Sequence, residues 1–214
     1  MNPALAVAPG VTLWPLRLDP GEQSALLDEI FAGVARAPFF DPTMPRTGKK
    51  FSVRMTNFGL LGWVSDMEKG YRYEPVHPAT AAPWPPIPDR LLRLWDETTR
   101  YGAPPEACLV NLYDASARMG LHRDADEAAV EAPVLSVSLG DSAYFRFGAG
   151  SDKSGTRRVK LNSGDVLMFG GPARLMYHGI DRVLPGTSTL VPGGGRINLT
   201  LRRVTRPGGT NPGN

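Results

Sequence analysis

The sequence predicts an α+β fold, namely a double-sheet jelly roll (double-stranded β-helix) with flanking helices packed outside it. Two observations predict this class. The first hundred residues contain two segments with helical spacing of apolar residues, and period-two alternation begins after Pro105 and continues to residue 204. Many short strands preceded by two helices are typical of this architecture. We expect one domain over residues 1–205, with its jelly-roll core at 106–204.

The first helix is expected to begin after Asp19. Asp19 and Glu22 have the spacing of a capping box, and Pro20 suits the first helical position. Apolar residues then recur at helical spacing until Pro38 closes the segment. A second helix is predicted over residues 89–101, with Gly102 as its stop.

The C-terminal half contains strand candidates separated by Gly, Asp, Ser and Pro. They are residues 107–113, 134–139, 143–147, 158–161, 165–169, 175–178 and 195–204. Residues 41–88, between the helices, are rich in Gly, Pro and aromatics, and they predict short strands and a shaped loop region. The composition of the tail, residues 206–214 (RPGGTNPGN), predicts disorder.

The composition limits where in the cell the protein is expected and which partners it can have. Hydrophobic residues make up 42% of the chain and charged residues 21%, which is typical of a globular protein. No apolar run approaches the roughly 18 residues that span a bilayer, and Met1–Gly10 lacks a charged region of the secretory type. We expect a cytoplasmic monomer with no membrane partner. A net charge of +3 permits contact with nucleic acid without requiring it.

The single cysteine, Cys108, excludes an internal disulfide and any zinc site with more than one thiolate. It lies in an apolar run, which predicts a buried structural thiol. The chain has only three histidines. One of them, His77, lies in a proline-flanked loop and is interpreted as a structural or surface residue.

The other two histidines predict a metal site. His122 and Asp124 point to the same side of an extended segment, because residues i and i+2 do so. His178 lies in a second extended segment bounded by glycine, and a facing strand would deliver it to the same ion. Two histidines and one carboxylate that leave open positions are typical of non-haem Fe(II) oxygenases. We therefore expect iron at this triad and an oxygen-activating enzyme.

Two alternatives apply to the triad. The H-x-D motif is weak by itself, so His122 could be a solvated loop histidine. The chain could also be a non-catalytic β-barrel binding module in which the motif is coincidental.

The segment 196–202 (RINLTLR) alternates polar and apolar residues. Its polar strand face carries Arg196, Asn198, Thr200 and Arg202. One interpretation is a half-exposed strand with a solvated polar face. The other turns this face into the barrel, where an arginine fork binds a carboxylate of an iron-bound dicarboxylate. Asn111 and Tyr113 likewise lie on one face of another strand. Periodicity leaves both interpretations open.

Aromatic residues stand beside glycines in MTNFG, GW and GYRY of residues 55–73. They either cover the edge of the core or form a stacking platform for a planar base. Four nearby cations would suit phosphates, although such a run is usually a solvated face. They are Arg46, Lys49, Lys50 and Arg54.

These residues resemble the AlkB family of Fe(II)/2-oxoglutarate-dependent nucleic-acid dealkylases. The resemblance extends from Pro15 to Val204 and is densest in the ordered blocks MTNFGLLGW, ACLVNLY, LHRDADE, APVLSVSLG, GDVLMFGG, YHGI and RINLTLR. It implies a nucleotide-recognition lid within residues 41–88. It also implies oxidative demethylation of 1-methyladenine and 3-methylcytosine with O2, which releases succinate, CO2 and formaldehyde. The implied partner is single-stranded DNA carrying methylated bases, with RNA as a second candidate.

The resemblance also implies a role for each matching position. Iron would be held by His122, Asp124 and His178. Arg196 would pair with the distal carboxylate of 2-oxoglutarate, and the rest of that site would be Asn111, Tyr113, Asn198 and Arg202. The base would be held by Met55, Trp63, Tyr71 and Tyr73, with His122 on its other side. Asp126 would favour a cationic, methylated ring.

The chain departs from the family pattern at positions that concern substrate preference. The spacer between Trp63 and Tyr71 is one residue longer than expected, and Asp152 stands near the place of a substrate-contacting arginine, with Lys153 beside it. Arg123 replaces a glutamine and Gly120 a serine. An oxygenase that acts on a protein or small molecule is therefore the alternative.

Overall fold

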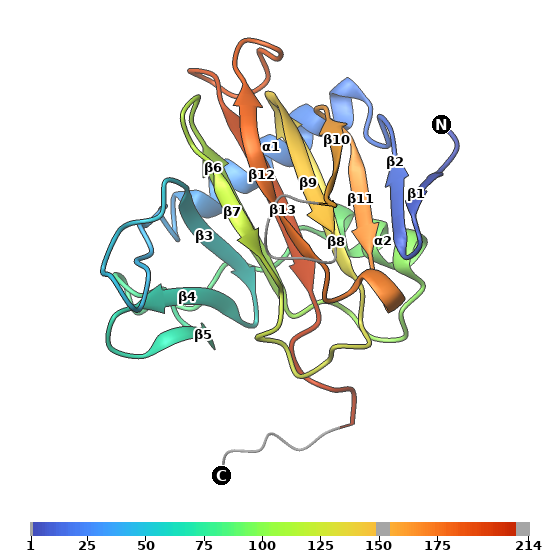
Figure 1. Cartoon of the computed structure of the whole chain (residues 1–214). Coiled ribbons are helices and arrows are strands. Elements are labelled where there is room, and N and C mark those ends of the chain that lie inside the picture. Colours follow the sequence, from blue (N-terminus) through green and yellow to red (C-terminus); the bar gives the residue numbers. More distant parts are fainter. Residues whose placement is uncertain (1, 149–154, 209–214) are drawn as a thin grey trace.

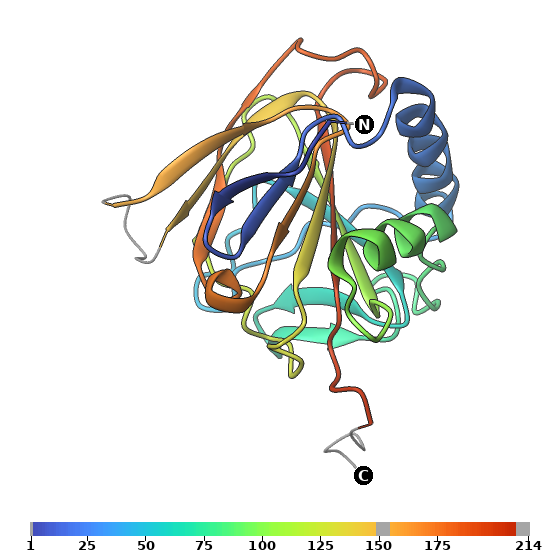
Figure 2. The same ribbon diagram turned by 90° about the vertical axis from the view of Figure 1, so that its right-hand side faces the viewer.

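The computed structural model is a jelly roll of two facing β-sheets, and it describes residues 2–148 and 155–208 (Figures 1 and 2). Within these ranges the larger sheet has seven strands, in spatial order β1 (Leu5–Ala8), β2 (Val11–Trp14), β11 (Val166–Phe169), β8 (Val134–Gly140), β13 (Arg196–Arg202), β6 (Ala107–Tyr113) and β3 (Arg54–Gly59). The smaller sheet orders β10 (Arg157–Leu161), β9 (Ser142–Gly148), β12 (Tyr177–Leu184) and β7 (Met119–His122). The predicted fold class is confirmed.

Two helices cover the outer face of the larger sheet (Figure 2). The helix α1 (Pro20–Val34) begins with the predicted capping box, in which the side chains of Asp19 and Glu22 each accept a hydrogen bond of 2.8 Å from the other's backbone N–H. The helix α2 (Asp89–Thr99) ends before the expected stop at Gly102. Arg100 adopts a left-handed φ of 52° and terminates the helix there.

The apolar core has two layers. The first lies between the helices and the larger sheet and includes Leu26, Ile30, Leu91, Trp95, Val137 and Leu199, each 4% exposed or less. The second lies between the two sheets and is dominated by Phe145, Phe147 and Phe169. Because every residue of β8 and β13 is buried, on both faces of each strand, these strands lie at the centre of the fold.

Some strands differ from the sequence prediction. The candidate at 175–178 is wrong in its bounds, since β12 begins at Tyr177 and runs on to Leu184 as a long, bulged strand. The strands β1 and β2 were not expected, because β1 is an exposed edge strand without a clear apolar alternation. The tail predicted to be disordered lies outside the described residues from position 209 on.

The region 41–88 contributes both to the sheet and to a separate hairpin. Its first strand, β3, pairs with β6 and extends the larger sheet. Its next two strands, β4 (Gly62–Asp66) and β5 (Gly70–Glu74), form the hairpin, which we call the lid hairpin. The buried amide of Asn57 in β3 bonds the backbone N–H and C=O of Trp63 at 3.0 Å each, so the lid hairpin is attached to the jelly roll at that point.

Candidate metal and cosubstrate site

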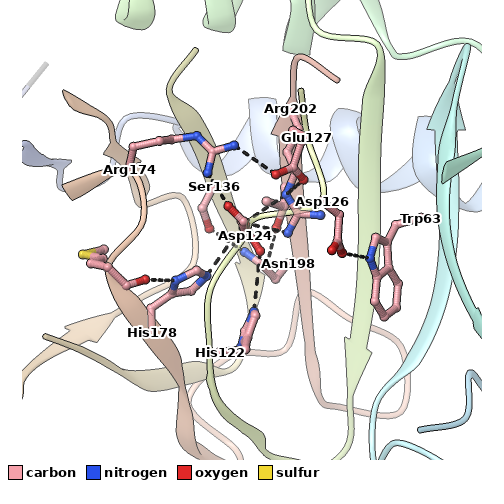
Figure 3. Close-up of polar contacts among 12 residues, drawn as sticks. Trp63, His122, Asp124, Asp126, Glu127, Ser136, Arg174, His178, Asn198 and Arg202 are labelled. Atoms are coloured by element: carbon pink, nitrogen blue, oxygen red, sulfur yellow. Dashed lines mark hydrogen bonds and ion pairs between the residues drawn. The ribbon is translucent and has the colours of Figure 1, made fainter. Parts of the chain in front are cut away.

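The three residues predicted as metal ligands converge on one point. His122 is the last residue of β7 and is paired in register with His178 of β12, while Asp124 follows in the adjoining loop. The distance from Asp124 Oδ1 to His122 Nε2 is 3.7 Å, and that from Asp124 Oδ2 to His178 Nε2 is 3.8 Å (Figure 3). Because the three ligand atoms lie within 4.8 Å of one another, they are close enough to share one ion.

Both imidazoles are oriented by their second nitrogen. Nδ1 of His122 lies 2.9 Å from the carbonyl oxygen of Gly120, and Nδ1 of His178 lies 3.2 Å from that of Met176. A carbonyl can only accept, so each Nδ1 carries the proton and each Nε2 presents its lone pair to the ion. Burial, with the neighbouring His122, lowers the pKa of His178 to about 4, so this ligand is neutral at pH 7.

The carboxylate of Asp124 is held ionised by its surroundings. Burial by itself opposes ionisation, but Arg202 and the two histidines outweigh it, and the pKa of Asp124 lies well below its usual range. Arg202 contacts Oδ2 of Asp124 from Nη2 at 2.8 Å and from Nε at 3.0 Å. The donor set of two imidazoles and one carboxylate suits a divalent non-haem iron.

A buried arginine that sequence reasoning missed supports the loop carrying Asp124. Arg174 is 3% exposed and donates to the backbone carbonyl of Asp124 at 2.6 Å and to that of Ala132 at 2.8 Å. Its Nη2 lies 3.0 Å from the carboxylate of Glu127, which is also buried (Figure 3). Arg174 lies outside the sequence blocks singled out above, and Glu127 closes the block LHRDADE without a role assigned to it, because the two irregular segments are brought together only in the fold.

The polar face of β13 points into the barrel. Arg196, Asn198, Thr200 and Arg202 are each 8% exposed or less, which contradicts the alternative of a solvated face. They line a cavity together with Asn111, Tyr113, His122 and His178. All five residues predicted to bind the cosubstrate therefore surround one space next to the metal ligands.

The deepest of these residues has unused hydrogen-bond donors. Arg196 is 0% exposed and donates from Nη2 to Ser138 at 2.9 Å. Within residues 2–148 and 155–208, its Nε and Nη1 and the side-chain oxygen of Asn111 are the buried side-chain polar atoms without a partner. Burial lowers the pKa of Arg196 to about 10. A buried guanidinium with two unpaired nitrogens fits the distal carboxylate of 2-oxoglutarate.

The other predicted cosubstrate residues differ in how fully they are paired. Asn198 already donates to Ser136 at 2.7 Å and accepts from Thr200 at 3.0 Å, so its amide stiffens the wall of the cavity. Ser136 and Ser138 were not predicted, although polar residues at alternate positions of an otherwise apolar strand were a usable signal. Arg202 is paired with Asp124, so it connects the cosubstrate cavity to the metal site.

A second cavity adjoins the first and shares His122 and Arg202 with it. Its walls include four of the five predicted substrate residues, Met55, Trp63, Tyr71 and Asp126. Trp63 and Tyr71 stack with ring centroids 5.5 Å apart, and Trp63 Nε1 donates to Asp126 at 2.9 Å. Tyr73, the fifth predicted substrate residue, is not among the described residues that line this cavity. Its hydroxyl bonds Glu127 and lies 3.3 Å from Arg202, two residues that do line the cavity.

Other residues singled out from the sequence lie away from this site. His77 is 1% exposed and bonds the carbonyl of Pro38, so it is structural. Lys50 pairs with Asp41 at 2.8 Å, and Arg54 lies over the ring of Phe39. Asp152 and Lys153 lie outside the described residues.

The fold and the site define a class of protein. Residues 10–202 match the 2OG-Fe(II) oxygenase superfamily, so the chain is a member of it, and Fe(II) and 2-oxoglutarate are its cofactors. The chain is 54% identical over 200 residues to an alpha-ketoglutarate-dependent dioxygenase AlkB homolog of Caulobacter vibrioides, which covers 94% of this chain and 90% of the relative. The chain belongs to the AlkB family of dioxygenases.

Two further comparisons agree with this placement. The solved structure titled "The structure of OsALKBH1" superposes with a TM-score of 0.81 at 31% identity and covers 94% of this chain and 100% of that one. A protein of Arabidopsis thaliana named DNA N(6)-methyladenine demethylase ALKBH1D is 40% identical over 108 residues, 46% of this chain and 24% of the relative. Among the described residues no helix is long and apolar enough to cross a membrane.

Proposed function

We propose that this chain is an oxidative demethylase of N-alkylated bases in nucleic acid. The observation that carries the proposal is that two cavities meet at one metal triad. The first contains the unpaired guanidinium nitrogens of Arg196, which suit a dicarboxylate. The second is walled by the aromatic lid hairpin and Asp126, which suit a flat, cationic base.

The residues have distinct tasks in this reaction. Bound iron, with 2-oxoglutarate and oxygen, supplies the oxidant that hydroxylates an N-methyl group, and the hydroxymethyl product releases formaldehyde. Arg196 anchors the distal carboxylate and thereby fixes the orientation of the cosubstrate. Arg202 holds the carboxylate of Asp124, and the carbonyls behind the two histidines hold their Nε2 atoms toward the ion.

We propose 1-methyladenine and 3-methylcytosine in single-stranded DNA as preferred substrates, with RNA as a second one. Both methylated rings are cationic, and Asp126 is the carboxylate that faces the cavity beside Trp63. Trp63 and Tyr71 offer π faces on which a base can stack. Single strands are favoured because flipping a base costs least where it is already unpaired.

The test is formaldehyde release from a panel of methylated DNA and RNA oligonucleotides in the presence of Fe(II) and 2-oxoglutarate. We expect one formaldehyde per succinate on 1-methyladenine and 3-methylcytosine. Succinate formation without formaldehyde on any nucleic acid would contradict the proposal and favour a protein or small-molecule substrate.

Two variants test the metal ligands. His178→Ala is expected to abolish both turnover and stoichiometric iron binding. His77→Gln, which changes a buried histidine outside the triad, should bind iron as the wild type does. Unchanged iron binding by the His178 variant would remove His178 from the metal site.

The oligomeric state and compartment belong to the proposal as well. We propose a monomer that acts in the cytoplasm and uses O2 as its oxidant. Light scattering after size-exclusion chromatography tests the first point, and a single peak at 23.1 kDa is expected.

A further inference from the structure

The outer face of the smaller sheet is a basic surface beside the base cavity. The helices pack on the far side of the molecule, against the larger sheet, and leave this face open (Figure 2). The edge strand β7 lies between the lid hairpin on one side and β12, β9 and β10 on the other (Figure 1). The outer face of β12, β9 and β10 therefore begins where the wall of the base cavity ends.

Strand alternation decides which residues face outward. Phe145, Phe147 and His178 point between the sheets, so their alternate neighbours point away from the core. The outward side chains are Tyr144 and Arg146 of β9, Arg158 and Lys160 of β10, and Tyr177 and Arg182 of β12. Arg158, Lys160 and Arg182 are exposed.

Two tyrosines organise the arginines on this face. Tyr144 is paired in register with Arg182, and its ring lies under the guanidinium carbons of Arg158 at 4.2 Å and of Arg182 at 5.4 Å. Tyr177 carries the guanidinium of Arg123 at 4.9 Å. A guanidinium stacked on a ring keeps its N–H edge free and loses less conformational entropy when it binds an anion.

These stacked arginines are not neutralised within the described part of the chain. Arg146 is paired with Asp181, its Nε lying 2.7 Å from Oδ2. By contrast, no described carboxylate forms an ion pair with Arg123, Arg158 or Arg182. Like charges gathered at this spacing repel one another, so an anionic partner stabilises them.

The two arginine–tyrosine stacks define a path that leads away from the base cavity. Arg123 belongs both to the cavity wall and to the stack on Tyr177, which is paired in register with Gly148. Tyr144 lies four residues further along β9, roughly 13 Å away at the usual rise per residue. A stacked strand with one phosphate per roughly 3.4 Å places about four phosphates over this distance.

We propose that Arg158 and Arg182, stacked on Tyr144, bind the sugar-phosphate backbone of the nucleic-acid strand that flanks the flipped base. This inference rests on the proposed function and adds to it a backbone-binding surface outside the catalytic cavity. Phosphate contacts position a strand without reading its sequence, so the surface is expected to serve any flanking sequence.

The test compares the Arg158→Ala/Arg182→Ala double variant with wild type in two assays. In the first, fluorescence anisotropy measures binding of an unmethylated single strand of about 15 nucleotides to metal-free protein over a range of salt concentrations. We expect affinity to fall on the order of ten-fold and the slope of log K against log salt to become shallower by roughly 1.4. Unchanged affinity and slope would overturn the proposal.

The second assay measures demethylation of the same lesion in a long strand and in a trinucleotide. The KM of the double variant for the long strand should rise, whereas its kinetics on the trinucleotide should remain those of the wild type. The matched control, Arg36→Ala/Arg93→Ala, removes two exposed arginines near the helices and should leave both substrates unaffected. Equal loss on both substrates would contradict a backbone role.

A third variant tests the stacking itself. Tyr144→Leu keeps every charge but removes the ring, so it should weaken long-strand binding less than the double arginine variant does. An effect equal to that of Arg36→Ala/Arg93→Ala would contradict the role of the ring. Failure of the proposed function can be told apart from failure of this inference, because the anisotropy assay requires no demethylation. A wild type that binds strands but releases no formaldehyde would contradict only the catalytic proposal.

Discussion

Trp63 of the lid hairpin donates a hydrogen bond from Nε1 to Oδ2 of Asp126, at 2.9 Å. Asp126 lies two residues after the metal ligand Asp124, so this bond connects the lid to the loop that holds the ion (Figure 3). It also aims one carboxylate oxygen at the indole and leaves the charge at the margin of the base cavity. The bond therefore has a structural part and an electrostatic part, which two variants separate.

Trp63→Phe removes the hydrogen bond and keeps the charge, whereas Asp126→Asn keeps an acceptor for Trp63 and removes the charge. We expect the first to lower kcat/KM about equally on cationic and neutral methylated bases, because it loosens the lid. The second should lower it roughly ten-fold more on 1-methyladenine than on neutral N6-methyladenine, since it removes one charge–charge attraction near the protein surface. Parallel losses in both variants would contradict an electrostatic role for Asp126.

Arg196→Met should separate cosubstrate binding from stability. The KM for 2-oxoglutarate is expected to rise at least about 100-fold, because a bidentate charge-assisted pair is lost. The unliganded protein should be as stable as wild type or more so, since two guanidinium nitrogens are buried there without a partner. Thermal denaturation without 2-oxoglutarate measures this, and a large fall in Tm would show that Arg196 has a structural role.

In contrast to Arg196→Met, Arg174→Met should lower the stability of the unliganded protein. It removes the closer of the two arginines that pair with the buried carboxylate of Glu127, since Arg202 lies farther away at 3.5 Å, and losing a partner of a buried ion pair costs about 3–5 kcal/mol of unfolding free energy. Adding Glu127→Gln, which removes the carboxylate charge that has lost this partner, should recover part of the loss in urea denaturation. A double variant less stable than Arg174→Met would indicate that Glu127 serves mainly Tyr73 and Arg202.

Cys108 predicts an alkaline loss of stability. Burial raises the pKa of its thiol to about 12, against 9.0 for the free group. Above pH 9 the unfolded chain releases this proton while the folded chain keeps it, so stability present below pH 9 is lost as the pH rises toward 12. Between pH 8 and pH 10 the thiol should contribute a loss of about 1.4 kcal/mol.

The control for this prediction is Cys108→Ala, compared with wild type by urea denaturation at both pH values. The variant is less stable overall, but its stability should fall less steeply over this interval. Equal slopes for the two proteins would show that the thiol does not titrate differently on folding.

Much of the fold could be predicted because its signals are local. The capping box at Asp19 needs only residues within one helical turn, and the alternation of 107–113 and 196–202 is visible within each strand. The edge strand β1 and the end of α2 at Arg100 could not be predicted. The four residues of β1, LAVA, are all apolar and show no period-two alternation, and a left-handed φ at a residue other than glycine is imposed by its surroundings.

In the site, too, the residues with a local sequence signal could be predicted and those without one could not. The two histidines and the carboxylate of the triad were identified from their spacing and their scarcity. Arg196 was singled out in an alternating strand, but periodicity left its direction open and only the family resemblance implied its role. By contrast, the pairing of Arg174 with Glu127 carries no local signal, since it joins segments 47 residues apart. The stacking of Arg158 and Arg182 on Tyr144 likewise depends on the register of three strands.

The sequence by itself determined which chemical groups are available: an imidazole and a carboxylate two residues apart, a second imidazole, and a strand with arginines on one face. Only the tertiary structure decided that this face is buried, that His178 is in register with His122, and that Trp63 reaches Asp126. The physical reason is that period-two alternation separates the two faces of a strand without saying which one is inside. That choice is made by the sheets and helices that pack against it.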